Sequence, residues 1–426
     1  MTAILFAMVL TATSPTAVAQ DSIPKVTLEE ALQLAAQLDP DYVSALSRIG
    51  DANWGLRAAK LAFYTPTLTA STSATKYSSE FFNIGTGQLA SRIIDAQVQA
   101  SYDLFTGGAK YYEAKRARAE LERAEAGEVE ARFRTALLTE TEYYDVIAQR
   151  ELVSVGRERV RRASEQLQIA RARVSAGGAV KTDTLQQLLE LNRARVELLR
   201  QEVVFKIARV QLGRRIGLAY EVGAKEEMEL AAPPLPLSEE DAAAEAVDSS
   251  PRAVAARAGE RAAAAAVKSV RGAYFPSVNV FGQWSAYDDS FFPSATKRTV
   301  YGVRLTLPIW DRGRREVTNQ LAKSDYRVAQ AERQDAELEV RQEAVRAYQA
   351  YNTARATAEI EQEALDVAGE NLRVQAERYR TGATTIIDLI TAQVELSEAE
   401  VALVQARQVT RLALARLEAL LGRRLF

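Results

Sequence analysis

The feature that most constrains this chain is an internal duplication. Two stretches match in order along most of the sequence, at an offset of about 205 to 210 residues. One unit of roughly residues 25–217 is therefore used twice, and the fold must be built from two copies of it. The matching pairs are Phe63–Pro66 with Ala273–Pro276, Leu104–Gly108 with Ile309–Gly313, Val174–Gly178 with Tyr379–Ala383, Asp183 with Asp388, and Gly217 with Gly422.

The duplication sets the domain boundaries that we expect. Residues 20–217 form the first repeat, residues 238–422 form the second, and residues 423–426 are a short C-terminal tail. Residues 218–237 join the repeats, and a group of prolines there indicates a non-helical crossover. These prolines are Pro233, Pro234 and Pro236.

The N-terminal residues have the features of an export signal. A short apolar stretch precedes Ala17-Val18-Ala19, the small-residue pattern that signal peptidase cleaves, so residues 1–19 would be a signal peptide. No Lys or Arg precedes the apolar stretch, which leaves a buried N-terminal segment as the alternative. The chain has no cysteine, so we expect no lipid-modified N-terminus and no disulfides, and stability must come from packing.

The composition excludes several classes of function. Without histidine or cysteine, the chain cannot build His-Cys zinc sites, thiol nucleophiles or a triad that uses imidazole as its base. The 54 basic and 56 acidic residues nearly cancel, so no electrostatic field gathers nucleic acid. An enzyme is the weaker alternative, because the acidic residues follow helical surface spacing without a phosphate loop, nucleophile elbow or metal cluster. We expect no enzymatic activity, no cofactor and no metal.

Each repeat has the pattern helix, strand, strand, long helix, turn, helix. The long helices are expected at about 108–174 and 313–380, where proline is absent and helix-forming residues dominate. A helix of about 67 residues would be roughly 100 Å long, which no compact globular domain requires. Apolar residues at heptad-like steps, such as Val160, Ala163 and Leu167, indicate coiled-coil packing. Shorter helices, two of which could lie end to end beside each long one, are expected near 41–63, 184–216, 252–273 and 386–421.

Four segments between the helices alternate as β-strands do. Val98 and Ala100 alternate with Gln97 and Gln99, for example. Each segment has about 9–12 residues, the length of a tilted outer-membrane strand, and a wall with one apolar and one polar face suits a water-filled barrel. The expected strands are at about 66–77, 93–105, 276–287 and 299–308.

Aromatic residues gather near both ends of these strands. This distribution resembles the two aromatic girdles of a membrane barrel. The alternative is a soluble sheet whose aromatic side chains form its core. The first group contains Tyr64, Phe105, Tyr274 and Trp310, with Phe63 and Phe275 beside them, and the second contains Tyr77, Phe81, Phe82, Tyr287, Phe291 and Phe292.

Four strands cannot close a barrel, and an open sheet edge in hydrocarbon leaves backbone groups without partners. The chain must therefore oligomerise to span a membrane. A dimer would supply 8 strands and a trimer 12, and only the larger barrel leaves a wide lumen. The sequence favours the trimer.

The arrangement of these motifs resembles the TolC family of outer-membrane efflux proteins. The motifs are Tyr-x-Pro before each strand pair, Leu104–Gly108 and Pro308–Gly313 after them, and Arg378–Ala383 at the end of a long helix. The resemblance covers roughly residues 25–422. It implies a homotrimeric channel-tunnel in the outer membrane of a Gram-negative-type bacterium, with a 12-stranded β-barrel in the lipid and a long α-helical barrel that extends into the periplasm.

The resemblance also implies partners. Proteins of this family are passive exit ducts for tripartite efflux pumps or type I secretion systems. They work with a periplasmic adaptor, also called a membrane fusion protein, and with an inner-membrane transporter of the RND, ABC or MFS type. The alternative is a periplasmic coiled-coil adaptor or structural protein without channel activity, but such a protein would carry β-rich flanks outside a single hairpin. Here strands occur inside each repeat.

The family pattern assigns roles to the turns after the long helices. It implies that the turns form the periplasmic tip that the adaptor contacts, and a plain helix–helix turn without a partner is the alternative for the glycines. The implied gate residues are Asp388, Asp183 and Tyr379, whereas Thr391 and Thr384 stand where the family has an aspartate and a basic residue. The implied adaptor contacts are Gly177, Gly178, Gly382, Ala383 and Thr384.

Asp388 has a second interpretation. Thr385-Ile386-Ile387-Asp388 has the pattern of a capping box, and an acidic residue in the first turn of a helix is favoured by the helix dipole. Helix capping and a gate role are compatible, and the sequence leaves both open.

Overall fold

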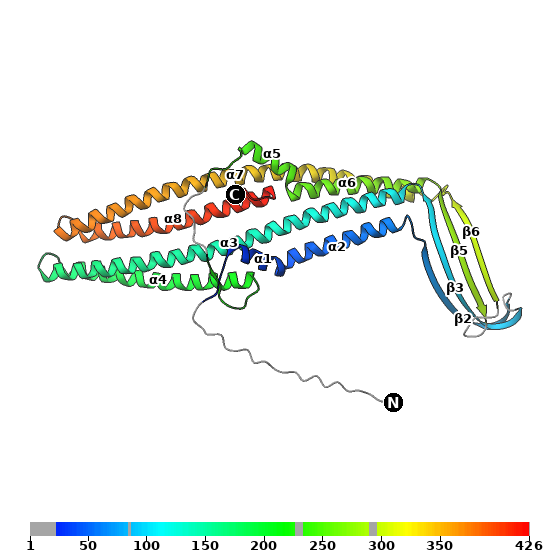
Figure 1. Ribbon diagram of the computed structural model, residues 1–426, viewed down its shortest axis with the longest axis horizontal. Helices are drawn as coiled ribbons and strands as arrows, with labels where there is room; N and C mark the ends of the chain where they lie inside the picture. The colour runs from blue at the N-terminus through cyan, green and yellow to red at the C-terminus, as the bar shows by residue number, and fades with distance from the viewer. Residues whose placement is uncertain (1–22, 84–86, 226–232, 289–295, 426) are drawn as a thin grey trace, which may run out of the picture.

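The computed structural model describes residues 23–83, 87–225, 233–288 and 296–425. The expected signal peptide at 1–19 and the expected girdle residues Phe291 and Phe292 lie outside these residues. The described chain is elongated, with helices along its length and a curved sheet at one end (Figure 1).

The two long helices are continuous, as the absence of proline predicts. α3 is Ala109–Ser175 and α7 is Arg314–Thr381. Two shorter helices lie end to end along each of them, so the expected stacking is confirmed (Figure 1). Beside α3 these are α2 (Pro40–Leu61) and α4 (Lys181–Arg215), and beside α7 they are α6 (Pro251–Arg271) and α8 (Ile386–Leu421). None of the helices in the described residues combines the length and the apolarity that a membrane crossing requires.

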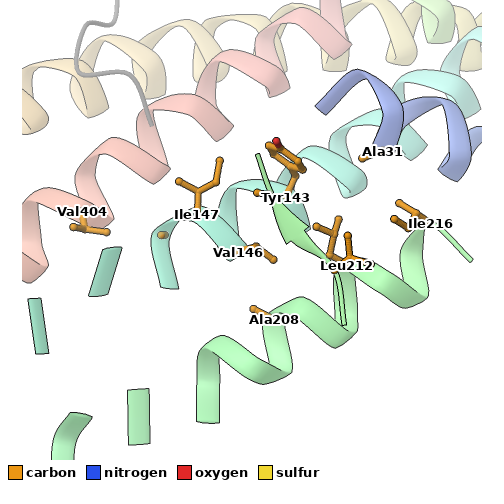
Figure 2. Close-up of a cluster of buried hydrophobic side chains, with 11 residues drawn as sticks. Ala31, Tyr143, Val146, Ile147, Ala208, Leu212, Ile216 and Val404 are labelled. Carbon is orange, nitrogen blue, oxygen red and sulfur yellow. The ribbon is translucent and has the colours of Figure 1, made fainter. Parts of the chain in front are cut away.

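The main core lies where the short helices meet the middle of a long one. In the first repeat, Tyr143 and Ile147 of α3 are fully buried against Leu212 near the end of α4 (Figure 2). Ile216, at the C-terminal end of α4, belongs to the same cluster, and Val404 of α8 joins the second repeat to it. Burial of each large apolar side chain contributes about 1.5–3 kcal/mol. At this junction, the packing holds the shorter helices against the middle of the long helix.

Two short helices and a small parallel sheet at these junctions were not expected from the sequence. α1 (Leu28–Leu38) starts at a capping box between Thr27 and Glu30, and α5 (Glu239–Ser249) occupies the corresponding place in the second repeat. β1 (Lys25–Val26) pairs with β4 (Gly223–Ala224), which lies inside the crossover 218–237. Strands of two residues leave no periodic pattern in a sequence, so only tertiary pairing reveals them.

The four larger strands form one antiparallel sheet in the order β2-β3-β5-β6. The central β3–β5 pairing joins the two repeats, while β2 and β6 are its edges and each pairs on one side only within the described residues. The strands are β2 (Thr67–Asn83), β3 (Gln88–Thr106), β5 (Ser277–Asp288) and β6 (Thr296–Thr306).

The strand bounds differ from the expectation in two ways. β2 and β3 have 17 and 19 residues, longer than the expected runs at 66–77 and 93–105, because their pairing resumes beyond a register shift after Lys76. β6 begins at Thr296 rather than at 299, and it ends at Thr306 rather than at 308 because Pro308 has no N–H to continue a ladder.

The chain passes from the sheet into α3 through a tight backbone contact. Gly107 has a φ of 62°, and a Cβ at this position would lie 2.3 Å from the carbonyl oxygen of Gly272. Gly313 precedes α7 with a φ of 79° but has open space around it. The first position therefore needs glycine for both conformation and space, and the second for conformation alone.

We predict that Gly107→Ala destabilises the protein more than Gly313→Ala. Each variant carries the left-handed penalty of about 1–2 kcal/mol for a residue with a Cβ, but only Gly107→Ala also pushes against backbone. Thermal unfolding in detergent should show a lower midpoint for Gly107→Ala than for Gly313→Ala. Equal midpoints would contradict the close contact with Gly272.

The residues after α8 contact α5, α8 and α3. The Arg423 guanidinium pairs with both oxygens of the Glu245 carboxylate, and the backbone N–H of Leu425 donates to Glu418 at 2.7 Å. Arg424 Nη2 lies 3.7 Å from Glu140 Oε1 on α3. Burial raises the pKa of Glu140 to about 7, and the Arg424 charge offsets this only in part.

We predict that Glu140→Gln stabilises the protein at alkaline pH. Because the pKa of Glu140 is higher in the folded state than its ordinary 4.5, the wild type loses stability as pH rises from about 4.5 to about 7. Above pH 7 the variant should be more stable by about 3 kcal/mol, which is the pKa difference converted at about 1.4 kcal/mol per unit, and near pH 4 the two should be equal. Glu363→Gln, at an exposed position on α7, is the control for unfolding scans at pH 4 and pH 8. A gain in stability that is the same at pH 4 and pH 8 would contradict the raised pKa of a buried Glu140 carboxyl.

Candidate functional site

The residues selected from the sequence lie at opposite ends of the molecule. The α3–α4 and α7–α8 turns, residues 175–181 and 380–384, form one end, which we call the tip (Figure 1). The strand–helix junctions and the sheet form the other end.

Tyr379 and Asp183 are brought together at the tip. The Tyr379 hydroxyl donates to Asp183 Oδ2 at 3.1 Å, and both side chains are buried. Tyr379 lies in the last turn of α7 and Asp183 in the first turn of α4, so this bond joins the two helical hairpins. Burial and the bond to Asp183 raise the pKa of Tyr379 to about 12, which keeps the hydroxyl protonated as a donor. This contact lies within one protomer, and the gate role of the two residues stays a prediction.

Arg173, in the last turn of α3, completes this contact and was not found from the sequence. Its guanidinium lies 4.5 Å from the centre of the Tyr379 ring and donates to the backbone carbonyl of Tyr379. A second nitrogen donates to the carbonyl of Gly178 at 2.7 Å. The sequence offers only a weak indication of this role, because a basic residue near the C-terminus of a helix is already explained by its favourable interaction with the helix dipole.

A second connection between the hairpins lies farther along α3. Arg162 forms a two-pronged ion pair with Glu400 of α8, at 2.9 and 2.7 Å, and both side chains are largely buried. Planar, two-pronged pairs of this kind fix geometry as well as charge. The hairpins are therefore joined at the tip, at this ion pair and at the core around Val404.

Asp388 caps α8. Its backbone N–H donates to Thr385 Oγ1, its carboxylate accepts from the backbone N–H of Thr385, and the capping box is confirmed. Thr384 also donates to Asp388 Oδ2, at 2.8 Å. Bonds from the Thr385 hydroxyl, the Thr384 hydroxyl and the Thr385 backbone lower the pKa of Asp388. The carboxylate is exposed and ionised at neutral pH, and its gate role stays a prediction.

Both tip turns have the same backbone form. Gly177 and Gly382 have φ values of 75° and 85°, as expected for residues that end a helix in the left-handed region. The N–H of Gly178 donates to the backbone carbonyl of Arg173 at 2.8 Å, and the N–H of Ala383 donates to the backbone carbonyl of Arg378 at 2.7 Å. All four of these turn residues are exposed and Thr384 is half-buried. Their contact with an adaptor stays a prediction.

The expected girdle residues at the helix end of the sheet are exposed. Tyr64 and Trp310 are 83% and 80% exposed, and Phe105 and Tyr274 are 47% and 37% exposed. Among the described residues these four side chains form no core, which argues against the soluble-sheet alternative for this group. Exposed aromatic side chains at one level of a sheet suit a membrane interface.

The strand register gives the sheet two different faces. On the polar face, the Asn279 amide donates to Ser101 and Asp103 at 2.9 and 2.8 Å, and Gln283 donates to Gln97 at 3.1 Å. The opposite, apolar face carries Leu68, Val98, Tyr102, Val280, Trp284, Val303 and Leu305. Several of these apolar side chains are more than half exposed, which a water-soluble sheet would avoid. No group of acidic side chains in the described part of the chain is arranged to hold a metal ion.

Comparison with known proteins gives one family. The family model described as outer membrane efflux protein matches residues 31–218 and 242–423, which are the two repeats. A curated relative, outer membrane efflux protein BepC of Brucella suis, is 26% identical over 274 residues. That alignment covers 62% of this chain and 58% of the relative.

Solved structures with the same fold include several outer-membrane channels. The outer membrane protein VceC of Vibrio cholerae has a TM-score of 0.78 at 20% identity, over 94% of this chain and 97% of its own. The CmeC outer membrane channel of Campylobacter jejuni has a TM-score of 0.78 at 16% identity, over 98% of this chain and 94% of CmeC. The MtrE outer membrane channel of Neisseria gonorrhoeae, solved in its open state, has a TM-score of 0.78 at 18% identity. That match covers 98% of this chain and 96% of MtrE. At these identities the likeness shows the fold.

We predict that Tyr379→Phe loosens the tip. Removal of the hydroxyl leaves the buried Asp183 carboxylate without this partner, at a cost of about 1–3 kcal/mol. Amide hydrogen exchange should become faster in residues 173–183 and 379–386.

Tyr351→Phe is the matched control. It removes a buried hydroxyl from the same helix, one that donates to the Pro233 carbonyl at 2.6 Å, far from the tip. It should leave exchange at the tip unchanged. Unchanged exchange at the tip in Tyr379→Phe would show that the bond to Asp183 does not hold the hairpins together.

Proposed function

This chain belongs to the outer membrane efflux protein family, and we propose that three copies of it form a passive channel from the outer membrane into the periplasm. The observation that carries the proposal is the four-stranded sheet, which has one apolar and one polar face and two edge strands that pair on one side only within the described residues. Such a sheet suits lipid on one side and water on the other only if its edges are paired.

Pairing between protomers supplies that closure. β2 of one copy would pair with β6 of the next, and three copies would give a barrel of 12 strands. A dimer would give 8 strands, and barrels of that size have interiors that side chains nearly fill. The trimer therefore suits a protein that conducts solutes.

The helices continue the channel on the periplasmic side. α3 alone has 67 residues, which corresponds to about 100 Å, and its exposed faces suit packing against neighbouring copies. The strands lie inside each repeat and are joined in one sheet by the β3–β5 pairing, which distinguishes this chain from an adaptor with one hairpin.

A passive duct obtains its direction from its partners. We propose that the exposed tip turns contact a periplasmic adaptor and that an inner-membrane transporter of the RND, ABC or MFS type supplies the energy. The role would be in a tripartite efflux pump or a type I secretion system. The adaptor would favour the open state by binding it better than the closed one.

The tip supplies a physical basis for closure. The buried bond between Tyr379 and Asp183 and the stacked Arg173 hold the two hairpins together in the closed state. Three copies of the exposed, ionised Asp388 near the channel axis would attract cations.

We predict that Asp388→Ala raises single-channel conductance or reduces block by divalent cations in planar bilayers. The variant removes charge and a helix cap at the entrance. Glu395→Ala is the control, because it removes a carboxylate from the same face of α8 two turns farther from the tip. Currents that are unchanged in Asp388→Ala, or changed equally in both variants, would count against a gate at Asp388.

A further inference from the structure

A phenylalanine lies among the polar residues of the polar face. Phe281 of β5 lies in a row of hydrogen-bonding residues, between Asn279 and Gln283. Polar side chains on this face bond to one another across the strands. A large aromatic ring on a water-facing wall therefore needs a reason.

The neighbouring strand makes room for this ring. Phe281 is directly opposite Gly302 of β6, and a Cβ at Gly302 would lie 3.1 Å from Phe281 Cζ. The ring thus lies against the glycine backbone of the next strand, a position that a side chain at 302 would crowd. This contact fixes the ring on the wall.

A guanidinium completes the arrangement. Arg304, two residues beyond Gly302, has its Cζ 5.0 Å from the centre of the Phe281 ring, within range of a cation–π contact. Among the described residues, no carboxylate lies within ion-pair distance of Arg304. Asp103, in the same row of the sheet, accepts instead from the Asn279 amide at 2.8 Å. Arg304 therefore presents its hydrogen-bond donors without an acidic partner from its own wall.

We propose that Phe281 and Arg304 form a binding platform on the channel wall for aromatic anions. The guanidinium can donate two parallel bonds to a carboxylate or sulfonate, while the flat faces of the guanidinium and the ring accept a planar aromatic group. This inference rests on the proposed function, because the polar face becomes a lumen only in the closed barrel. A trimer would carry three such platforms at one level near the helical end of the barrel.

The test is block of single-channel current by naphthalene-2-sulfonate, with cyclohexanesulfonate as the probe of equal charge but no aromatic ring. The wild-type trimer should be blocked at lower concentration by the aromatic probe. Phe281→Leu and Arg304→Gln should each weaken that block about tenfold, as loss of a desolvated cation–π or charged hydrogen-bond contact would do.

Arg298→Gln is the matched control. Arg298 lies on the same strand and face as Arg304, opposite Ser285, so the variant removes the same charge from the same wall. It should change the block by the aromatic probe less than about threefold, an effect of general electrostatics. Phe281→Tyr keeps the ring and should keep the block, which controls for damage to the fold by changes at this position.

The outcomes separate this inference from the proposed function. A trimer that conducts but is blocked equally by both probes, or as strongly in Phe281→Leu as in the wild type, overturns the platform and leaves the channel intact. Equal weakening in Arg298→Gln and Arg304→Gln also overturns it, in favour of simple attraction by charge. A protein that forms no trimer and no conductance overturns both.

Discussion

The backbone groups along the outer edges of β2 and β6 have no strand partner within the described residues, and this constraint governs how the sheet can be completed. One protomer satisfies the backbone of β3 and β5 on both sides, but each edge strand pairs on one side only within the described residues. In water an open edge invites aggregation, and in lipid it leaves donors and acceptors unsatisfied at several kcal/mol each. The exposed apolar face makes water the wrong solvent for this sheet. These constraints are the physical basis for our proposal that the sheet is completed by other copies of the chain.

The duplication explains how one chain supplies both the four-stranded sheet and the long helical part of the molecule. Each repeat contributes two strands and a long helix with two shorter helices end to end, and the β3–β5 pairing and the core around Val404 join the repeats. Duplication does not make the two tip turns equivalent in function. Asp183 is buried and accepts from Tyr379, whereas its counterpart Asp388 is exposed and caps a helix. Under the proposed function, this asymmetry would let one hairpin separate from the other by breaking a few polar contacts at the tip.

The sequence was sufficient for the features that depend on local pattern. Proline-free, helix-forming stretches predicted both long helices to within a residue, the alternation located all four strands, and the capping box at Thr385 and Asp388 was confirmed. What it could not provide depends on contacts between distant residues. Arg173 stacks on a ring 206 positions away in the chain. The pairing of β1 with β4 and the burial of Glu140 beneath the C-terminal residues are likewise set by the tertiary fold.

The measurement that tests this account most directly is disulfide trapping between the edge strands, which the absence of native cysteine makes clean. Ala70→Cys on β2 would be combined in turn with Tyr301→Cys, Val303→Cys or Leu305→Cys on β6, all on the apolar face. Oxidised outer membranes should give, for at least one pair, a ladder of covalent species that ends at the trimer, while each single variant stays monomeric. A ladder that ends at the dimer, or no cross-link for any pair, would contradict closure of the barrel by three copies.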